Sequence, residues 1–217
     1  DHVWATSWGV STRLMGALIM THSDDQGLVL PPNLAPYQVV IVPIYKSEEQ
    51  LEAIGAVAQD IMNTLRAENI SVKYDDRTTQ RPGAKFAQHE LQGVPLRIAI
   101  GPKDLEKGTV EVARRDTFSK MTFPLESLSK EIKTLLTDIQ QSLYRRAFDF
   151  RDAHITEVDS FEDFKKILGE KGGFISAHWD GTIATEQKIK DATKATIRCI
   201  PYDSVEAPGV CRVSGAP

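Results

Sequence analysis

A strand-like run followed directly by an amphipathic helix is the feature that most restricts the fold of this chain. Residues 37–44 are almost continuously apolar, which is typical of a buried strand. After Ser47, a plausible helix cap, apolar side chains recur at helical spacing at Leu51, Ile54, Val57, Ala58, Ile61 and Leu65. Further strands are predicted at 71–74, 94–100 and 109–115, and a helix at 85–91. Strands that alternate with helices predict an α/β fold around a mostly parallel or mixed sheet.

The rest of the chain divides at a proline-rich segment and at a long helical stretch. Prolines 31, 32 and 36 mark a first boundary, because proline interrupts both helices and ladders. One long helix is predicted within 125–151. A small α/β unit then follows, with helices at 160–168 and 185–193, strands at 173–177 and 195–200, and a possible further strand at 211–214. We therefore expect three parts: residues 1–36, 37–124 and 125–217.

Composition excludes several classes of protein. The net charge of −4 and the pI near 5.8 argue against indiscriminate nucleic-acid binding, although a local basic face is compatible with them. No apolar run approaches the roughly twenty residues that span a bilayer. The two cysteines, Cys199 and Cys211, are too few for a disulfide framework or a four-thiolate zinc site. We expect a reducing, cytoplasmic setting, and Cys199 as a small buried residue of the strand at 195–200.

Polar and aromatic residues suited to RNA recognition are concentrated between residues 75 and 120. Phe86 and Glu90 share one face of a predicted helix, and Arg97 lies in an otherwise apolar strand. A carboxylate accepts from the N1–H and N2–H groups of guanine, while arginine or lysine donates to O6 and N7. This chemistry predicts a guanine-reading surface made of Phe86, Glu90 and Arg97, Lys103 and Asp104 in a loop after Gly-Pro, and Arg114, Arg115 and Lys120. The alternative is a structural ion pair between Glu90 and Arg97 on a solvated, charged surface.

The N-terminal segment also pairs glycine with arginine. Residues 6–13 read Thr-Ser-Trp-Gly-Val-Ser-Thr-Arg, so that Arg13 opens a mostly apolar helix close to Gly9. A permanently charged guanidinium beside glycine is suited to a phosphate group. The other interpretation is a buried strand and helix in which Arg13 pairs with a carboxylate.

These phrases resemble a known family. Residues 6–13, with Gly27-Leu-Val-Leu-Pro-Pro-Asn-Leu-Ala-Pro36, resemble motif 3 of the prolyl-tRNA synthetases, which are class II aminoacyl-tRNA synthetases. Phrases from Tyr74 to Asp116, including Arg81-Pro-Gly-Ala-Lys-Phe86 and Gly101-Pro-Lys-Asp-Leu105, resemble the anticodon-binding domain of the same family. One departure is His89, which stands where the family usually has tryptophan.

The resemblance implies a fold and a set of roles. The fold is a mixed five-stranded sheet with flanking helices, plus a small C-terminal α/β domain. Arg13 contacts ATP, and Trp8 and Gly9 line the proline pocket. Phe86, Glu90, Arg97, Lys103 and Asp104 read the guanines that end the proline anticodon, with Arg114, Arg115 and Lys120 nearer the RNA backbone. The family implies ATP with Mg²⁺, L-proline and tRNA(Pro) as ligands, and a homodimer formed through the catalytic domain. We expect this chain to be a C-terminal portion, inactive alone, of an archaeal/eukaryotic-type enzyme.

The resemblance also implies a lost metal site. Members of this type carry zinc on four cysteines of the C-terminal domain, at positions where this chain has Asp180, Thr185, Cys211 and Ser214. Neither threonine nor serine is a usual zinc ligand. We therefore expect no zinc, with the open alternative that Asp180 and His178 rebuild a site.

Two other functions remain open at this point. A stand-alone accessory protein would use the anticodon-binding fold to bind RNA without aminoacylation, and it leaves the motif around Arg13 without a purpose. A purely structural dimerisation domain leaves the guanine-reading residues unexplained.

Overall fold

The structure is a computed structural model that describes residues 3–202, 204 and 209–216. The chain forms two compact units, Asp1–Ala147 and Phe148–Pro217. Helix α1 (Arg13–His22) precedes the sheet of the first unit. Within the described residues, no helix combines the length and the apolar composition that a membrane crossing requires.

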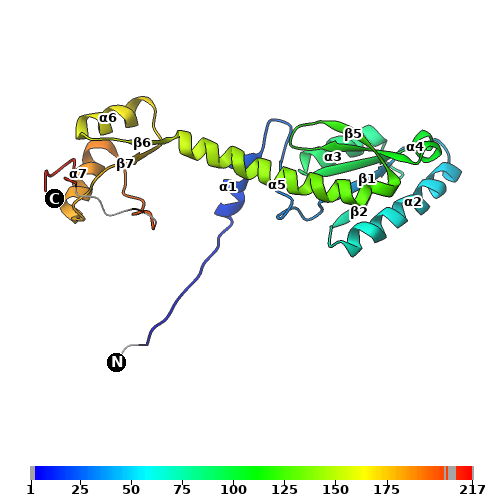
Figure 1. Cartoon of the computed structure of the whole chain (residues 1–217), viewed down its shortest axis with the longest axis horizontal. Helices are drawn as coiled ribbons and strands as arrows, with labels where there is room; N and C mark the ends of the chain where they lie inside the picture. Colours follow the sequence, from blue (N-terminus) through cyan, green and yellow to red (C-terminus); the bar gives the residue numbers. More distant parts are fainter. Residues whose placement is uncertain (1–2, 203, 205–208, 217) are drawn as a thin grey trace. The chain divides into compact units, whose positions relative to one another are not determined.

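A mixed five-stranded sheet organises the first unit (Figure 1). Its strands are β1 (Val39–Pro43), β2 (Val72–Tyr74), β3 (Leu96–Ile100), β4 (Thr109–Arg114) and β5 (Lys120–Pro124). They lie in the order β2-β1-β3-β4-β5. Strand β1 pairs in parallel with β2 and β3, whereas β4 runs antiparallel to both of its neighbours. The predicted α/β class and the five-stranded mixed sheet are confirmed.

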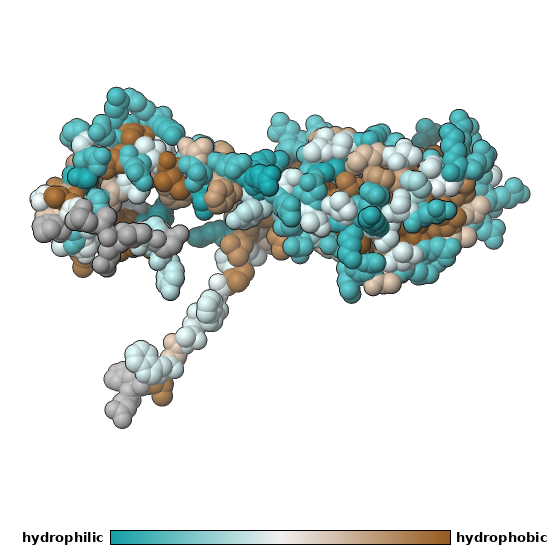
Figure 2. Space-filling view, in the orientation of Figure 1, coloured by the Kyte–Doolittle hydropathy of each residue, from teal (hydrophilic) through white to brown (hydrophobic). Residues whose placement is uncertain are grey.

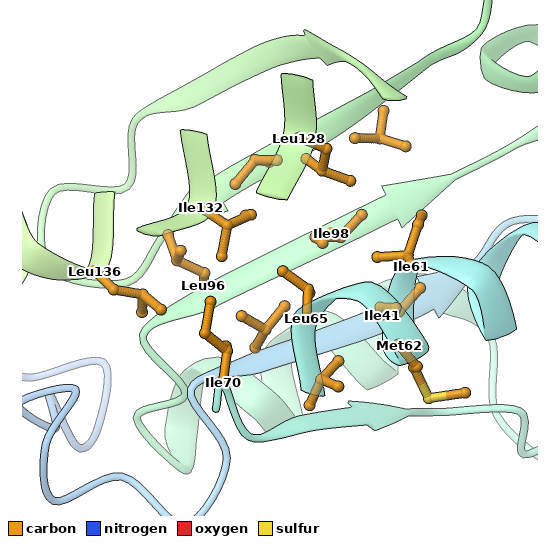
Figure 3. Packing of buried hydrophobic residues seen from close by; sticks show 14 of the residues in the cluster. Ile41, Ile61, Met62, Leu65, Ile70, Leu96, Ile98, Leu128, Ile132 and Leu136 are labelled. Atoms are coloured by element: carbon orange, nitrogen blue, oxygen red, sulfur yellow. The ribbon is translucent and has the colours of Figure 1, made fainter. Parts of the chain in front are cut away.

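One face of this sheet carries the apolar core. Helix α2 (Glu48–Ala67) and helix α5 (Leu128–Ala153) pack against it, and their buried side chains meet those of Ile41, Leu96 and Ile98 (Figure 3). A short 3₁₀ turn (Leu125–Ser127) leads into α5. As predicted, Ser47 caps α2, since its side chain accepts the backbone N–H of Gln50. Burial of these branched side chains is the main source of stability for a unit of this size.

The opposite face of the sheet combines buried apolar side chains with a buried charged residue. Side chains alternate across a strand, so the face that lies away from the core cluster carries Val40, Val42 and Ala99, all buried, and also Arg97. Helix α3 (Pro82–Leu91) packs on this face against β1. This placement puts a charged strand residue directly beneath a helix.

Two elements of the first unit differ from the sequence prediction. The loop expected after Gly101-Pro102 is a short helix, α4 (Pro102–Lys107), which starts at proline and is capped by Asp104. The strand expected at 109–115 ends at Arg114, and a further strand that the residue pattern did not predict, β5, follows it at the edge of the sheet. The turn between them contains Phe118 at a positive φ of 58°. A turn without glycine at that position gives no hairpin signal in the sequence.

Among its described residues, the second unit contains the end of α5, two strands and two further helices. Strands β6 (Ile155–Glu157) and β7 (Phe174–Ser176) pair in parallel, and helices α6 (Phe161–Glu170) and α7 (Ile183–Thr193) follow them in turn. The strands expected at 195–200 and 211–214 are wrong: the first is irregular and the second is a turn, and neither pairs with another described strand. Cys199 is exposed rather than buried for the same reason, whereas Cys211 is buried.

Candidate nucleic-acid interface

Helix α3 presents two different faces, and the candidate interface depends on this division. Lys85 and His89 lie four residues apart and are 1% and 3% exposed, although both are polar. Phe86 and Glu90, also four apart, are only half-buried. The i, i+4 spacing places each pair on one side of the helix. The structure thus confirms that Phe86 and Glu90 share a face, and it adds a buried basic face behind them.

The buried face of α3 is held by one carboxylate, that of Asp75. This residue follows β2 and is 1% exposed. Its two oxygens accept a bidentate pair from Arg77 at 2.7 and 2.6 Å, and Oδ2 also accepts from His89 Nε2 at 2.8 Å. Lys85 Nζ donates to the backbone oxygen of Asp75 at 2.7 Å and lies 3.7 Å from its Oδ1. The neighbouring Arg77 guanidinium, more than any other group, holds the pKa of Asp75 well below its usual range.

Arg97 is the least satisfied polar side chain of the face beneath α3. Its guanidinium stacks on the Phe86 ring at 3.6 Å from the centroid. It is 6% exposed, and its Nε and Nη1 have no hydrogen-bond partner among the described residues. Glu111 Oε1 lies 3.6 Å from Nη1, which is an ion pair rather than a hydrogen bond. Burial lowers the pKa of Arg97 from its ordinary value, opposed by the charges of Glu111 and Glu90.

Glu90 and Arg97 both line a small hollow at the end of α3. Its other lining residues are His89, Val94, Ala113, Arg114 and Arg115. The hollow measures about 10 Å³, the space of a single water molecule. Within the described part of the chain, Glu90 forms no ion pair, so the Glu90–Arg97 pair that we weighed as an alternative is not formed; the partner of Arg97 is Glu111.

Arg114, the last residue of β4, and Arg115, which follows it, are both engaged by carboxylates. Arg114 forms a bidentate pair with Asp116 at 2.9 and 2.8 Å and reaches Asp138 at 2.5 Å. Asp116 first, and then Asp138, raise the pKa of Arg114. Arg115 is 3% exposed and pairs with Asp24. These side chains are therefore less free than their sequence position indicates.

The remaining predicted site residues lie outside the hollow. Lys120 is exposed on β5 with its Nζ 3.7 Å from Glu111. Lys103 is exposed on α4, and Asp104 uses its Oδ2 to accept the backbone N–H of Gly101 at 2.8 Å. Asp104 thus caps a helix, in addition to any contact with RNA.

The N-terminal residues form a separate feature. Trp8 and Gly9 lie in an extended, exposed segment, and Arg13 is exposed at the start of α1. Within the described residues, the carboxylate partner that we considered for Arg13 is absent. The side chain is available to a ligand or to another part of a longer protein.

Sequence reasoning missed the buried partners of this interface. A basic pair at i, i+4 on the inner face of an amphipathic helix needs a carboxylate beneath it, so Lys85 and His89 pointed to a residue such as Asp75. No comparable signal exists for Asp24, which meets Arg115 from 91 residues away.

In the second unit, the four positions considered for zinc lie together but hold one another by hydrogen bonds. Asp180 Oδ2 accepts from Thr185 Oγ1 at 2.8 Å and from Ser214 Oγ at 2.6 Å. Asp180 Oδ1 accepts the backbone N–H and the hydroxyl of Thr182 at 3.0 and 2.9 Å. These bonds, that from Ser214 above all, lower the pKa of Asp180. Cys211, in the turn that holds Ser214, is buried.

This donor set does not fit zinc. It offers one thiol and one carboxylate, and both oxygens of that carboxylate already accept two hydrogen bonds. The His178 ring packs directly against Gly209, where an added Cβ would come within 2.5 Å of it. Within the described residues, no group of three histidine, cysteine, aspartate or glutamate side chains is arranged to hold a metal. The family resemblance implies zinc-bound thiolates at these positions. Here the hydroxyl groups of Thr185 and Ser214 instead donate hydrogen bonds to the Asp180 carboxylate.

Two family models match this chain. Residues 38–135 match the model described as "Anticodon binding domain". Residues 161–217 match the model described as "Prolyl-tRNA synthetase, C-terminal". The sheet with its polar α3 face thus lies within a domain of the anticodon-binding class.

The similarity to curated relatives extends over the whole chain. The chain is similar to proline–tRNA ligases from Christiangramia forsetii (68% identical), Flavobacterium johnsoniae (65%) and Porphyromonas gingivalis strain ATCC 33277 (59%). Each match covers 100% of this chain and 44% of the relative. The chain belongs to the prolyl-tRNA synthetase family and spans less than half the length of these relatives.

A first prediction concerns Asp75. Asp75→Asn should lower the free energy of unfolding by about 3 kcal/mol at pH 7, because Lys85 loses a buried counter-charge and His89 loses a charged hydrogen-bond acceptor. The native carboxyl has a lowered pKa, so its stabilising effect is complete above the ordinary pKa of about 4 and is lost as the pH falls from there. Denaturant unfolding of both proteins should therefore show a difference that narrows on acidification.

Asp76→Asn is the matched control, because Asp76 is adjacent and exposed. It should change stability by less than about 0.5 kcal/mol. Equal losses for the two variants, or a difference independent of pH, would contradict the role assigned to Asp75.

A second prediction concerns metal. The purified chain should contain well under one zinc ion per molecule, and a chelator should leave its melting temperature unchanged, because hydrogen bonds rather than a cation join Asp180 to Ser214. Elemental analysis that finds one tightly held zinc per chain would refute this assignment.

Proposed function

We propose that this chain is the anticodon-reading portion of a proline–tRNA ligase. The complete enzyme would use ATP with Mg²⁺ to attach L-proline to tRNA(Pro) through prolyl-adenylate, in the cytoplasm and as a homodimer. The family membership and the relatives' names support this proposal. Residues 37–124 would form the anticodon-binding domain, residues 1–36 the end of the catalytic domain, and residues 125–217 the linking helix and C-terminal domain.

The observation that carries this proposal is the unsatisfied guanidinium of Arg97. Burying hydrogen-bond donors without partners is unfavourable by about 1–3 kcal/mol, and more for charged groups. Arg97 keeps two such atoms while Phe86 fixes the plane of its guanidinium. A planar fork held in this way is suited to guanine, because arginine can donate to its O6 and N7 atoms in a bidentate manner.

Glu90 supplies the complementary acceptor. Its carboxylate, on the same hollow as Arg97, is suited to the N1–H and N2–H groups of a guanine. Because the hollow holds only a water-sized volume, a base would lie across its mouth and present an edge rather than enter. The ring of Phe86, also half-exposed, offers a stacking surface for an unstacked base.

The charged residues around this centre would meet the RNA less specifically. We assign Lys120, which is exposed, to the phosphate backbone, whereas the guanidinium of Arg114, which lines the hollow, is already paired with Asp116 and Asp138. Lys103 and Asp104 would meet the anticodon from α4, with Asp104 limited by its capping bond to Gly101.

Helix α1 supports an origin in a larger enzyme. Figure 2 shows apolar surface gathered over this helix, and Leu14, Met15, Ile19 and Met20 are 45–83% exposed. A soluble domain seldom leaves such a cluster uncovered. We propose that the remainder of the enzyme covers it and thereby brings Arg13 to ATP, with Trp8 and Gly9 at the proline pocket. A stand-alone accessory protein leaves this helix unexplained.

The main test of the proposal is tRNA binding. Glu90→Ala and Arg97→Ala should each weaken binding to tRNA(Pro) by about 1–3 kcal/mol, because each removes a contact to a base edge. The loss should largely vanish for a tRNA whose two anticodon guanines are replaced. Calorimetric titration of both variants against both tRNAs measures this directly.

Two further variants sharpen this test. Arg97→Lys keeps the charge but lacks the fork, so it should resemble Arg97→Ala against guanines. Lys120→Ala, which removes an exposed charge, should weaken the binding of both tRNAs equally and flatten the salt dependence of binding. If Glu90→Ala and Arg97→Ala weakened both tRNAs equally, guanine reading by these residues would be rejected.

Catalysis gives a separate prediction. The 217-residue chain should not exchange pyrophosphate in the presence of proline and ATP. In the complete enzyme, Arg13→Ala should slow that exchange by about 10²–10³-fold, as loss of a charge-stabilising donor typically does. Unchanged exchange in the variant would contradict the role of Arg13.

A further inference from the structure

Arg115 is buried in the candidate interface, and its guanidinium is engaged by partners within the chain. Its Nη1 and Nη2 donate to Asp24 Oδ2 and Oδ1 at 2.8 and 2.6 Å, and its Nε donates to the backbone oxygen of Glu90 at 2.8 Å. Phe118 lies over the guanidinium at 5.0 Å. Three separate parts of the first unit thus meet at one side chain: the segment after α1, the end of α3 and the end of β4.

The segment that supplies Asp24 is closely fitted to the end of α3. The backbone N–H of Leu28 donates to the Leu91 oxygen at 3.0 Å. Gly27, at a φ of 133°, lies so near that an added Cβ would be 2.7 Å from the Cα of Leu91. Asp24 and Gly27 form an isolated bridge that fixes the turn between them. Asp24 is therefore held in place to receive Arg115.

We infer that Arg115 is a positioning residue which, with Asp24, fixes the last turn of α3 and so aims the Glu90 carboxylate across the hollow toward the base that Arg97 reads. This inference rests on the proposed function, since Glu90 must meet RNA for its aim to matter. It assigns to Arg115 a role in base specificity in place of a contact with the RNA backbone.

The electrostatics of Arg115 favour positioning over phosphate binding. The paired Asp24 carboxylate neutralises its charge, and the side chain is only 3% exposed. A phosphate would have to displace an existing bidentate pair, which is among the stronger hydrogen-bonded contacts in proteins. A cation at the C-terminal end of a helix also stabilises its last carbonyls, and here Arg115 donates to the carbonyl of Glu90, which also accepts the backbone N–H of Gly93 at 3.0 Å.

The test compares Asp24→Asn and Arg115→Ala in the 217-residue chain. Each should reduce the preference for tRNA(Pro) over the guanine-replaced tRNA by about tenfold, whereas the salt dependence of binding stays unchanged because no phosphate contact is lost. The double variant should lose no more than Arg115→Ala alone, because the two residues act through one contact. Amide hydrogen exchange without RNA should speed up at residues 90–93 in both variants.

Asp25→Asn is the matched control, since Asp25 is adjacent to Asp24 and exposed. It removes the same charge and should preserve both the preference and the exchange rates. Melting curves establish whether each variant is folded. If Arg115→Ala does not fold, Asp24→Asn, which keeps every cationic residue, tests the inference by itself.

Three outcomes would reject the inference. In the first, Arg115→Ala flattens the salt dependence of binding and weakens the binding of both tRNAs equally, while Asp24→Asn has no effect. Arg115 would then contact phosphate. In the second, both variants keep the full preference. In the third, the unaltered chain shows no preference, which would also reject the proposed function, whereas the first two leave that function intact.

Discussion

The buried carboxylate of Asp75 is the contact on which the recognition face depends. Removing a carboxylate from water is unfavourable by several kcal/mol unless cations and donors surround it, and Arg77, Lys85 and His89 all do so here. Two of these three residues belong to α3. The carboxylate therefore fixes the rotation of this helix about its own axis, and that rotation turns Phe86 and Glu90 outward. His89 contributes to this face through its hydrogen bond to the same carboxylate.

The two faces of the sheet have different roles, one in stability and the other in the proposed recognition of RNA. Its α2 and α5 face is packed with branched apolar side chains, whose burial is the main driving force for folding (Figure 3). The opposite face can therefore tolerate Arg97 with buried, unpaired donors, a local cost that a ligand would relieve. In the second unit, hydrogen bonds between Asp180 and its hydroxyl partners join the loop to the C-terminal turn.

Local patterns in the sequence predicted the parts of this structure that local forces determine. The buried strand before Ser47, the amphipathic helix after it and the shared face of Phe86 and Glu90 follow from side-chain periodicity alone. The five-stranded sheet came from the family resemblance, because β5 follows a turn with Phe118 at positive φ and carries no hairpin signal. The strand expected at 195–200 failed because alternation indicates a strand only when another strand pairs with it. Contacts such as Asp24–Arg115 join distant segments and are invisible to any local pattern.

The Arg97 Nε–H group offers the most direct test of guanine reading. Its signal in a ¹⁵N–¹H spectrum of the arginine side chains, assigned with Arg97→Lys, can be followed as an anticodon stem–loop of tRNA(Pro) is added. An unpaired donor that gains a base should show a saturable shift with this loop and none with a loop whose two guanines are replaced. A signal that stays unchanged at saturating tRNA(Pro) stem–loop, or one that shifts equally with both loops, would contradict the account.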